Sequence, residues 1–276
     1  MRAGVVGHVE WMEFINVDRL PAAGDIVHGT DSWQVPAGGG AVAAVQLAKL
    51  AGGATFFTAL GGDALGQAAR RELEKLGLRV EGAVRDEPQR RGITLVDTSG
   101  ERTITVIGKR VAPSFGDPLP WDDLEGMDAV YVTAGDAEAI RLARKARVLV
   151  ATSRILPVLK EAGVELDALV GSTRDPMEVF EPGDLDPAPR LVVRTDGSEG
   201  GTFTVAGAGS EPYEPAPLPG PVADTYGCGD SFAGALTYAL AAGLPPEEAV
   251  WFAAAAGAAV ATGRGPYEKQ RRDPLT

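Results

Sequence analysis

The second half of the chain alternates between short apolar runs and longer helix-forming stretches. The apolar runs predict buried strands, and the stretches between them predict helices. The strands are expected at 129–133, 148–151, 168–171 and 191–194, and the helices at 137–145 and 155–162. Strands that alternate with helices in this way are typical of parallel βαβ units. Because their crossovers are right-handed, the pattern predicts a doubly wound α/β layer.

The rest of the chain extends this pattern. Residues 3–9 form an apolar run behind one basic residue, which predicts a buried first strand. Two further runs, 91–96 and 102–107, predict strands joined by a turn. The remaining predicted elements are a strand at 55–60 and helices at 41–50, ending at about 76, at about 229–240 and at 247–262. Since no internal repeat or low-complexity linker divides the chain, residues 1–276 are expected to form a single domain.

Composition narrows the functions open to this chain. Its 276 residues are enough for one large α/β domain, and its formal net charge of −12 disfavours nucleic acid and anionic membranes as partners. Cys228 is the single cysteine and there are two histidines, so an internal disulfide is excluded and a His/Cys metal site is not expected. The apolar run at 251–262 is too short to span a bilayer. Without a secretory signal pattern, the protein is expected to be cytoplasmic.

The most informative stretch for chemistry is 222–234, Val-Ala-Asp-Thr-Tyr-Gly-Cys-Gly-Asp-Ser-Phe-Ala-Gly. Gly227 and Gly229 let the backbone turn tightly and come close to a ligand. A helix is expected to begin at about Gly229, and its first amides form a ready anion site. A carboxylate at Asp230 would repel a phosphate there, unless it takes a proton from a hydroxyl that attacks the phosphate. The alternative is that Asp230 only favours the first helical turn.

Cys228 carries a separate expectation. A thiol at a helix N-terminus can have a lowered pKa and react readily, and a nucleotide bound at the anion site would then slow its alkylation. The alternative is a buried and inert thiol.

The stretch 222–234 resembles the second signature of the ribokinase/PfkB family of carbohydrate kinases, and 37–66 is similar to its first, glycine-rich signature. The resemblance covers nearly the whole chain. It implies a ribokinase-like three-layer α/β/α fold, with a doubly wound, mostly parallel sheet and a small β-sheet lid formed from about 13–37 and 88–112. It also implies an ATP-dependent phosphotransferase that acts on a hydroxyl of a sugar-like small molecule, with magnesium bridging the ATP phosphates. Asp230 would be the catalytic base, and the backbone of Gly227, Cys228 and Gly229 would form the anion hole.

The resemblance further implies a nucleotide site. The T-x-G-x-x-G segment of the family, which lies under the nucleotide phosphates, falls on Thr195, Gly197, Ser198 and Gly200. The N-x-x-E motif of the family, which bears on magnesium and phosphate through water, falls on Ser172 and Asp175. Both side chains are shorter than the usual ones, so the contact of Asp175 with magnesium would be indirect. The other implied contacts are Thr225, Ala254 beside adenine, and Asp224 as a ligand for a monovalent cation such as potassium.

The positions implied to contact the acceptor depart from the family pattern. An Asn and an Asp usually follow the first strand, and these positions fall on Glu10 and Met12. The Asn at the start of the first helix falls on Val42. Gly38 and Gly39 are still expected to approach the substrate with their backbone. Glu10 is therefore either an acceptor contact or a solvated charge at a strand end.

Lys109 and Arg110 follow the second predicted lid strand. Two adjacent cations in an acidic protein suggest an acceptor that carries a carboxylate or a phosphate, with a solvated basic pair as the alternative. The exposed apolar face and open edges expected of the lid favour a homodimer formed through it. Two other functions stay open: a nucleoside or phosphosugar kinase of the same fold, and a non-catalytic regulator that binds a nucleotide or metabolite. The departures from the family pattern favour the regulator, and Asp230 argues against it.

Overall fold

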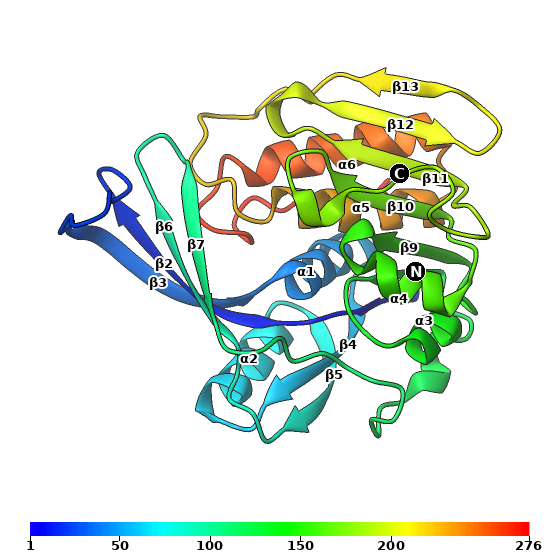
Figure 1. Ribbon diagram of the computed structural model, residues 1–276, viewed down its shortest axis with the longest axis horizontal. Helices are drawn as coiled ribbons and strands as arrows, with labels where there is room; N and C mark the ends of the chain where they lie inside the picture. The colour runs from blue at the N-terminus through cyan, green and yellow to red at the C-terminus, as the bar shows by residue number, and fades with distance from the viewer. Residues whose placement is uncertain (276) are drawn as a thin grey trace.

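The computed structural model describes residues 1–275, which form two β-sheets with flanking helices (Figure 1). The larger sheet has nine strands in the order β13-β12-β11-β10-β9-β8-β1-β4-β5, and the smaller has the order β3-β2-β6-β7. The strands are β1 (Ala3–Val6), β2 (Glu10–Val17), β3 (Gly29–Ala37), β4 (Ala54–Gly61), β5 (Leu78–Arg85), β6 (Arg91–Val96), β7 (Arg102–Ile107), β8 (Ala129–Val132), β9 (Val148–Thr152), β10 (Ala168–Ser172), β11 (Leu191–Thr195), β12 (Gly201–Val205) and β13 (Ser210–Tyr213). The α-helices are α1 (Gly39–Ala51), α2 (Ala64–Lys75), α3 (Ala137–Ala143), α4 (Leu156–Ala162), α5 (Cys228–Ala241) and α6 (Pro246–Val260).

The order of strands in the large sheet reverses beside β1. This strand pairs in parallel with β4 on one side and with β8 on the other. The chain first adds β4 and β5 on one side, and later adds β8, β9, β10 and β11 on the other, all parallel to β1. In open α/β sheets, ligands bind beyond the carboxyl ends of the strands at such a reversal. The ends of β1 and β8, at Val6 and Val132, therefore mark where a ligand site is expected.

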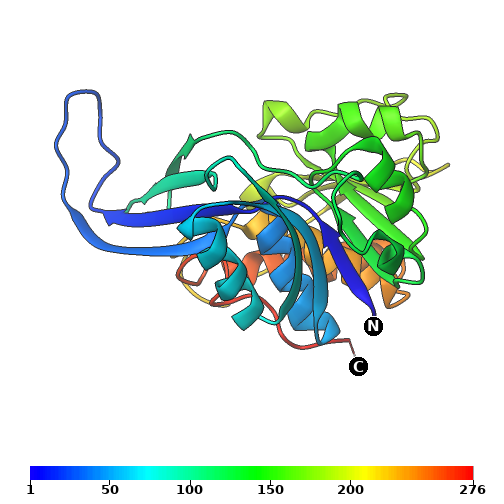
Figure 2. The same cartoon turned by 90° about the horizontal axis from the view of Figure 1, so that it is seen from below.

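Helices cover both faces of the large sheet. One cluster of buried side chains joins α1, α2, α5 and α6 to one face, and a second joins α3 and α4 to the other. Figure 2 shows these two groups on opposite sides of the sheet. This confirms the predicted three-layer, doubly wound, mostly parallel fold. Within residues 1–275, no helix combines the length and apolar character needed to cross a membrane.

The four-stranded sheet, which we call the lid, projects from the α/β layers (Figure 1). It begins with β2, which only residues 7–9 separate from β1. One face packs Met12, Phe14 and Val96 against Tyr226, which precedes α5. The edge strand β7 is exposed along its whole length. The lid is therefore anchored to the α/β layers at the start of α5, close to the glycine-rich stretch.

Three parts of the sheets differ from the sequence-based expectations. The first strand ends at Val6 and not at residue 9, and the first lid strand begins at Glu10, before the expected start of the lid at about residue 13. β5 was not expected because it has exposed polar residues and lies at the edge of the sheet. β12 and β13 were not expected because they are antiparallel strands of mixed composition, added at one end of the sheet.

Candidate active site

A left-handed glycine shapes the N-terminus of α5. Gly227 has a φ of 82°, which residues with a side chain rarely adopt, and a Cβ there would lie 3.0 Å from Val42 Cγ1. The first turn closes at once, since the Ser231 amide donates to the Gly227 carbonyl over 2.9 Å. Gly229 is exposed, with nothing within 4 Å of its Cβ position. Amides at the positive end of a helix, with open space before them, suit an oxyanion.

Asp230, in the first turn of α5, faces the first turn of α1. A Cβ built on Gly39 would lie 2.9 Å from Asp230 Oδ1 and 3.8 Å from His8 Cε1. Gly38 precedes α1 with a φ of 87°, and its amide donates to the Tyr226 hydroxyl over 3.2 Å. The two helix N-termini therefore meet. The missing side chains at 38 and 39 leave the carboxylate room to reach a ligand, and contact of these glycines with a substrate stays a prediction.

The surroundings of Asp230 raise its pKa to about 6. Burial is the largest cause, followed by the negative charge of Glu178, with a smaller effect of Glu10. The positive charges of Arg154 and Arg102 act in the opposite direction. The side chain keeps part of its surface exposed, so a solute can reach it. A carboxylate with this pKa is mostly ionised at pH 7 and is basic enough to accept a proton from a reacting hydroxyl.

Buried polar groups at the end of β1 and the start of β2 form the floor of the site. Glu10 Oε1 lies 3.0 Å from Arg90 Nε and 3.9 Å from His8 Nε2. Burial raises the pKa of Glu10 and lowers that of His8 to about 3, so His8 is neutral at pH 7. Met12 and Val42 have no exposed surface and pack in the apolar core of the lid. These two side chains would meet a ligand only if the lid moved.

Arg154, just after β9, holds two carboxylates beside the same site. It pairs with Asp175, and its Nε lies 3.0 Å from Glu178 Oε1. Glu178 Oε2 also accepts a hydrogen bond from the Ser172 amide over 2.8 Å. Asp175 caps the short helix that follows it. The resemblance pointed to Ser172 and Asp175, and the structure adds Glu178 as the carboxylate whose charge acts on the pKa of Asp230.

The segment after β11 lies beside Ser172 at the same edge of the sheet. β10 and β11 are parallel, and Ser172 is opposite Thr195 in register. Gly197 has a φ of 58°, and a Cβ there would lie 2.9 Å from Arg174 Nη1. Gly200 has a φ of 80°, and a Cβ there would meet backbone at 2.1 Å. The chain therefore needs glycine at both positions for its backbone path, whether or not a nucleotide binds there.

The loop before α5 contains a buried carboxylate with a free oxygen. Asp224 Oδ1 accepts from the Tyr226 amide over 2.8 Å, while Oδ2 has no hydrogen-bond partner among residues 1–275. Burial raises the pKa of Asp224. The Thr225 hydroxyl accepts a hydrogen bond from Arg102 of β7, so the lid reaches this loop.

Burial raises the pKa of Cys228 to about 12, so the expectation of a reactive thiolate was wrong: desolvation outweighs the helix dipole.

The other predicted contacts lie at the rim of this region. Ser198 is exposed, and its hydroxyl donates to Glu199 Oε1 over 3.1 Å. Ala254 is half-buried on α6. Lys109 and Arg110 are exposed in the segment after β7. The roles inferred for these residues stay predictions.

Sequence analysis missed three charged residues that act on the centre of the site. These are Arg102 at the start of β7, Arg154 in the short helical turn after β9, and Glu178 at the end of the short helix after β10. Arg102 begins a strand that the sequence did predict, and Glu178 stands three positions after Asp175. Examining a few residues beyond each predicted strand or motif could have identified Arg102 and Glu178. Arg154 could not be identified in this way, because it comes near Glu178 only through the pairing of β9 with β10.

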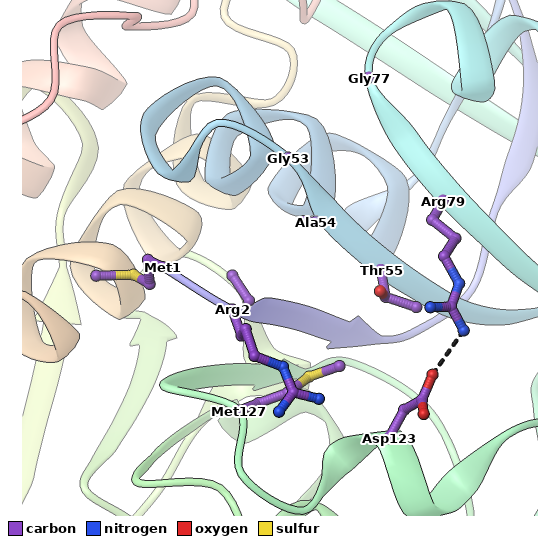
Figure 3. Close-up of a pocket in the computed structure, with 10 residues that line it drawn as sticks. Met1, Arg2, Gly53, Ala54, Thr55, Gly77, Arg79, Asp123 and Met127 are labelled. Atoms are coloured by element: carbon purple, nitrogen blue, oxygen red, sulfur yellow. Dashed lines mark hydrogen bonds and ion pairs between the residues drawn. The ribbon is translucent and has the colours of Figure 1, made fainter.

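A separate cavity opens at the opposite, amino ends of the strands (Figure 3). It encloses about 260 Å³ and is lined by Arg2, Thr55, Arg79, Asp123 and Met127, among others. Its Arg79 is already paired with Asp123 over 2.6 Å, as the dashed line shows. Because open α/β sheets bind ligands beyond the carboxyl ends of their strands, we place the site at Asp230 instead.

Comparison with known sequences identifies relatives over almost the whole chain. The model of the pfkB family carbohydrate kinases matches residues 2–161 and 158–272. The chain is 25% identical to a ribokinase of Arabidopsis thaliana over 286 aligned residues, which cover 91% of this chain and 74% of the relative. It is 28% identical to an ATP-dependent ribose-1-phosphate kinase of Halopiger xanaduensis, with 94% of this chain and 91% of the relative covered.

Comparison with solved structures gives the same fold. A ribokinase from Thermotoga maritima has a TM-score of 0.77 at 22% identity, covering 99% of this chain and 97% of the other. Arabidopsis thaliana ribokinase, solved with ribose and ATP, has a TM-score of 0.73 at 22% identity, covering 98% and 95%.

Proposed function

The chain belongs to the pfkB family of carbohydrate kinases, and we propose that it transfers the terminal phosphoryl group of ATP to a hydroxyl of a sugar or sugar-like small molecule. The observation that carries this proposal is Asp230, which has a pKa of about 6 and lies where the N-termini of α1 and α5 meet. The relatives named ribokinase support a sugar as acceptor and ATP as donor.

In the proposed reaction, the acceptor hydroxyl lies between Asp230 and the backbone of Gly39. Asp230 accepts the hydroxyl proton while the acceptor oxygen bonds to the terminal phosphorus and the bond to the ADP oxygen breaks. The amides of Gly227, Cys228 and Gly229 face the oxygens of the transferred group. They are fixed before the reaction, so they stabilise its charge without reorganising.

The nucleotide would lie across the strand ends next to the anion hole. Its phosphates would meet the segment from Thr195 to Gly200, with Ser172 and Thr225 beside them. Adenine would pack near Ala254 on α6 and be held mainly by shape. The parallel register that sets Ser172 against Thr195 supports this path.

Magnesium suits this site as a partner of the nucleotide. Residues 1–275 contain no group of three or more His, Cys, Asp or Glu side chains that could hold a metal by themselves. Magnesium commonly keeps several waters and binds to phosphates with one or two carboxylates, and Glu178 and Asp175 would bear on it through water. When bound, it would neutralise charge on the ATP phosphates.

A monovalent cation suits the loop before α5. The buried Oδ2 of Asp224 has no hydrogen-bond partner among residues 1–275 and is an oxygen of the kind that potassium binds, and burial raises the pKa of Asp224 although the charge of Arg102 acts in the opposite direction. We propose Asp224 as the side-chain ligand.

The lid offers a surface for a second copy of the chain. β7 is an exposed edge strand on which Ile104, Val106 and Ile107 are each about 40% exposed. An open edge with apolar side chains is prone to pair. We propose a homodimer through the lid, which a molar mass measured by light scattering in solution would test.

The kinase proposal is tested by replacing the base while keeping its shape. Asp230→Asn should lower kcat by about two to four powers of ten, the usual size of a general-base effect, and leave ATP binding intact. Asp122→Asn, an exposed carboxylate on the amino side of β8, is the matched control and should keep full activity. If Asp230→Asn keeps wild-type turnover, the proposed base is wrong. A protein that binds ATP but phosphorylates no acceptor would instead support the regulator.

A further inference from the structure

An arginine with no partner lies where the chain leaves the lid. After β7 the chain turns at Gly108, where a Cβ would lie 3.9 Å from Arg90 Cα (Figure 1 shows this segment returning from the lid). Two residues later, the guanidinium of Arg110 forms no ion pair or hydrogen bond with any residue in 1–275, and part of it is exposed. Arg90 has one charged contact, the pair with Glu10, and its buried Nε has no hydrogen bond of good geometry.

These two arginines face the floor beside Asp230, together with Arg154. Arg90 contacts this floor directly, since Glu10 Oε1 lies 3.0 Å from Arg90 Nε and 3.9 Å from His8 Nε2. The positive charges of Arg110, Arg90 and Arg154 add to the effect of burial in lowering the pKa of His8. The charges of the same three arginines lower the pKa of Glu10, against the larger effect of burial, which raises it. The His8 ring in turn lies beside Gly39, which faces Asp230. Arg90 and Arg110 therefore lie at the acceptor end of the site, on the side of β1, β2 and the lid, while Arg154 follows β9.

Of the three arginines, two have carboxylate partners and one has none. Arg154 is already matched by Asp175 and Glu178, and Arg90 is matched by Glu10. Arg110 is left over on an exposed stretch of chain. Partial desolvation of its guanidinium and the charges of Arg90 and Arg154 lower its pKa, while the charge of Glu10 acts in the opposite direction. An oxyanion bound between Arg110 and Arg90 would relieve this repulsion. It would also supply the bidentate partner that a guanidinium is shaped to bind.

Building on the proposed kinase function, we infer that the acceptor is anionic: a phosphate or carboxylate group on the sugar binds between Arg110 and Arg90 while its hydroxyl reaches Asp230. The nucleotide segments lie on β10 and β11, and β8 and β9 separate these strands from β1, whereas Arg90 and Arg110 lie at the lid. The anion that these arginines receive therefore belongs to the acceptor and not to ATP. The expected specificity is a preference for sugar phosphates or sugar acids over neutral sugars.

The test compares matched acceptors on wild-type enzyme and on Arg110→Gln. Each pair has one charged and one neutral member: a pentose phosphate with its parent pentose, and an aldonic acid with its parent aldose. The charged member of one pair should have a kcat/KM at least about tenfold higher, and the better pair tells phosphate from carboxylate. Arg110→Gln should lower this kcat/KM by about 10- to 100-fold, chiefly through KM, as expected for the loss of a charge-assisted contact. Arg110→Lys should restore part of it.

The matched control is Arg91→Gln. Arg91 is exposed on β6 next to Arg90, on the opposite face of the strand from the buried Gly92, so its loss should change none of these values. If neutral sugars are phosphorylated as well as charged ones and Arg110→Gln changes neither, the inference is overturned while the kinase function stands. If Arg110→Gln raises the KM of ATP instead, the arginine serves the nucleotide and the inference is also overturned.

A binding measurement separates failure of this inference from failure of the kinase function. Thermal unfolding is followed with and without the pentose phosphate or aldonic acid, in wild-type protein, Asp230→Asn and Arg110→Gln. We expect the anion to raise the unfolding temperature of the first two and not of the third. This result with no turnover on any acceptor would refute the kinase while keeping the anion site. Equal stabilisation of Arg110→Gln would overturn the anion site.

Discussion

Replacing Asp230 by asparagine should stabilise the protein at the same time as it abolishes activity. The reason is that the site holds the carboxylate in surroundings that disfavour its charge. Its pKa is about 6 in the folded protein against 3.8 ordinarily, with burial and the charge of Glu178 as the main causes. At pH 7 the ionised carboxylate therefore lowers the free energy of unfolding. Asparagine removes the charge and has almost the same volume.

The size and sign of the effect follow from linkage. A shift of about two pKa units corresponds to at most about 3 kcal/mol, and the partial exposure of the side chain reduces this to about 1–2 kcal/mol. Because the folded pKa lies above the unfolded one, the contribution of Asp230 to stability is largest below pH 3.8 and is lost as the pH rises through 6. The advantage of Asp230→Asn should therefore be full at pH 8 and should shrink between pH 6 and pH 4.

Urea unfolding followed by circular dichroism at pH 8, 7, 6 and 5 measures this difference directly. His8 also responds to acid, because its lowered folded pKa means that its contribution to stability is lost as the pH falls below 6.5. It is present in both proteins and cancels in the difference. Asp230→Asn being less stable than wild type at pH 8, or a difference that does not vary with pH, would refute the reasoning.

Three other predictions follow from the contacts around Asp230. Gly39→Ala places a methyl group 2.9 Å from Asp230 Oδ1, so kcat should fall by tenfold or more, whereas Gly116→Ala, with nothing within 4 Å, should have no effect; steady-state kinetics decides. In Glu178→Gln the acid limb of kcat/KM against pH, near pH 6 in the wild type, should move to lower pH because the charge that raises the pKa of Asp230 is gone; an unmoved limb would show that this charge does not reach the base. Asp224→Asn should abolish any activation by potassium, measured against sodium at constant ionic strength, and activation that persists would place the cation elsewhere.

Much of the fold could be predicted from the sequence because its central strands are buried on both faces. Runs such as 129–133 and 148–151 lie in the middle of the sheet, so they are apolar throughout and easily recognised. The strand at 78–85 lies at the edge, where Arg79 is exposed and Glu81 half-buried, so it lacks the unbroken apolar run by which the central strands were recognised. The start of the lid strand at residue 10 was missed for a similar reason, because a charged residue begins the strand and only three residues separate it from β1.

The candidate site could be predicted where a local motif makes it. Asp230 and the glycines around it are contiguous, so their spacing alone indicates a helix start with a base in its first turn. Arg154 and Glu178 are neighbours only because β9 and β10 pair, and a single sequence does not contain that information. Met12 illustrates the reverse: its position suggested an acceptor contact, while the fold turns it into the core of the lid.

The most direct test of sugar kinase activity is ADP release from Mg-ATP with a panel of sugars, sugar acids, sugar phosphates and nucleosides, run in parallel with Asp230→Asn. We expect turnover on one acceptor class and its loss in the variant. Turnover that survives in Asp230→Asn would contradict the assignment of the base. ATP binding without ADP release on any acceptor would contradict the assignment of the protein as an active sugar kinase.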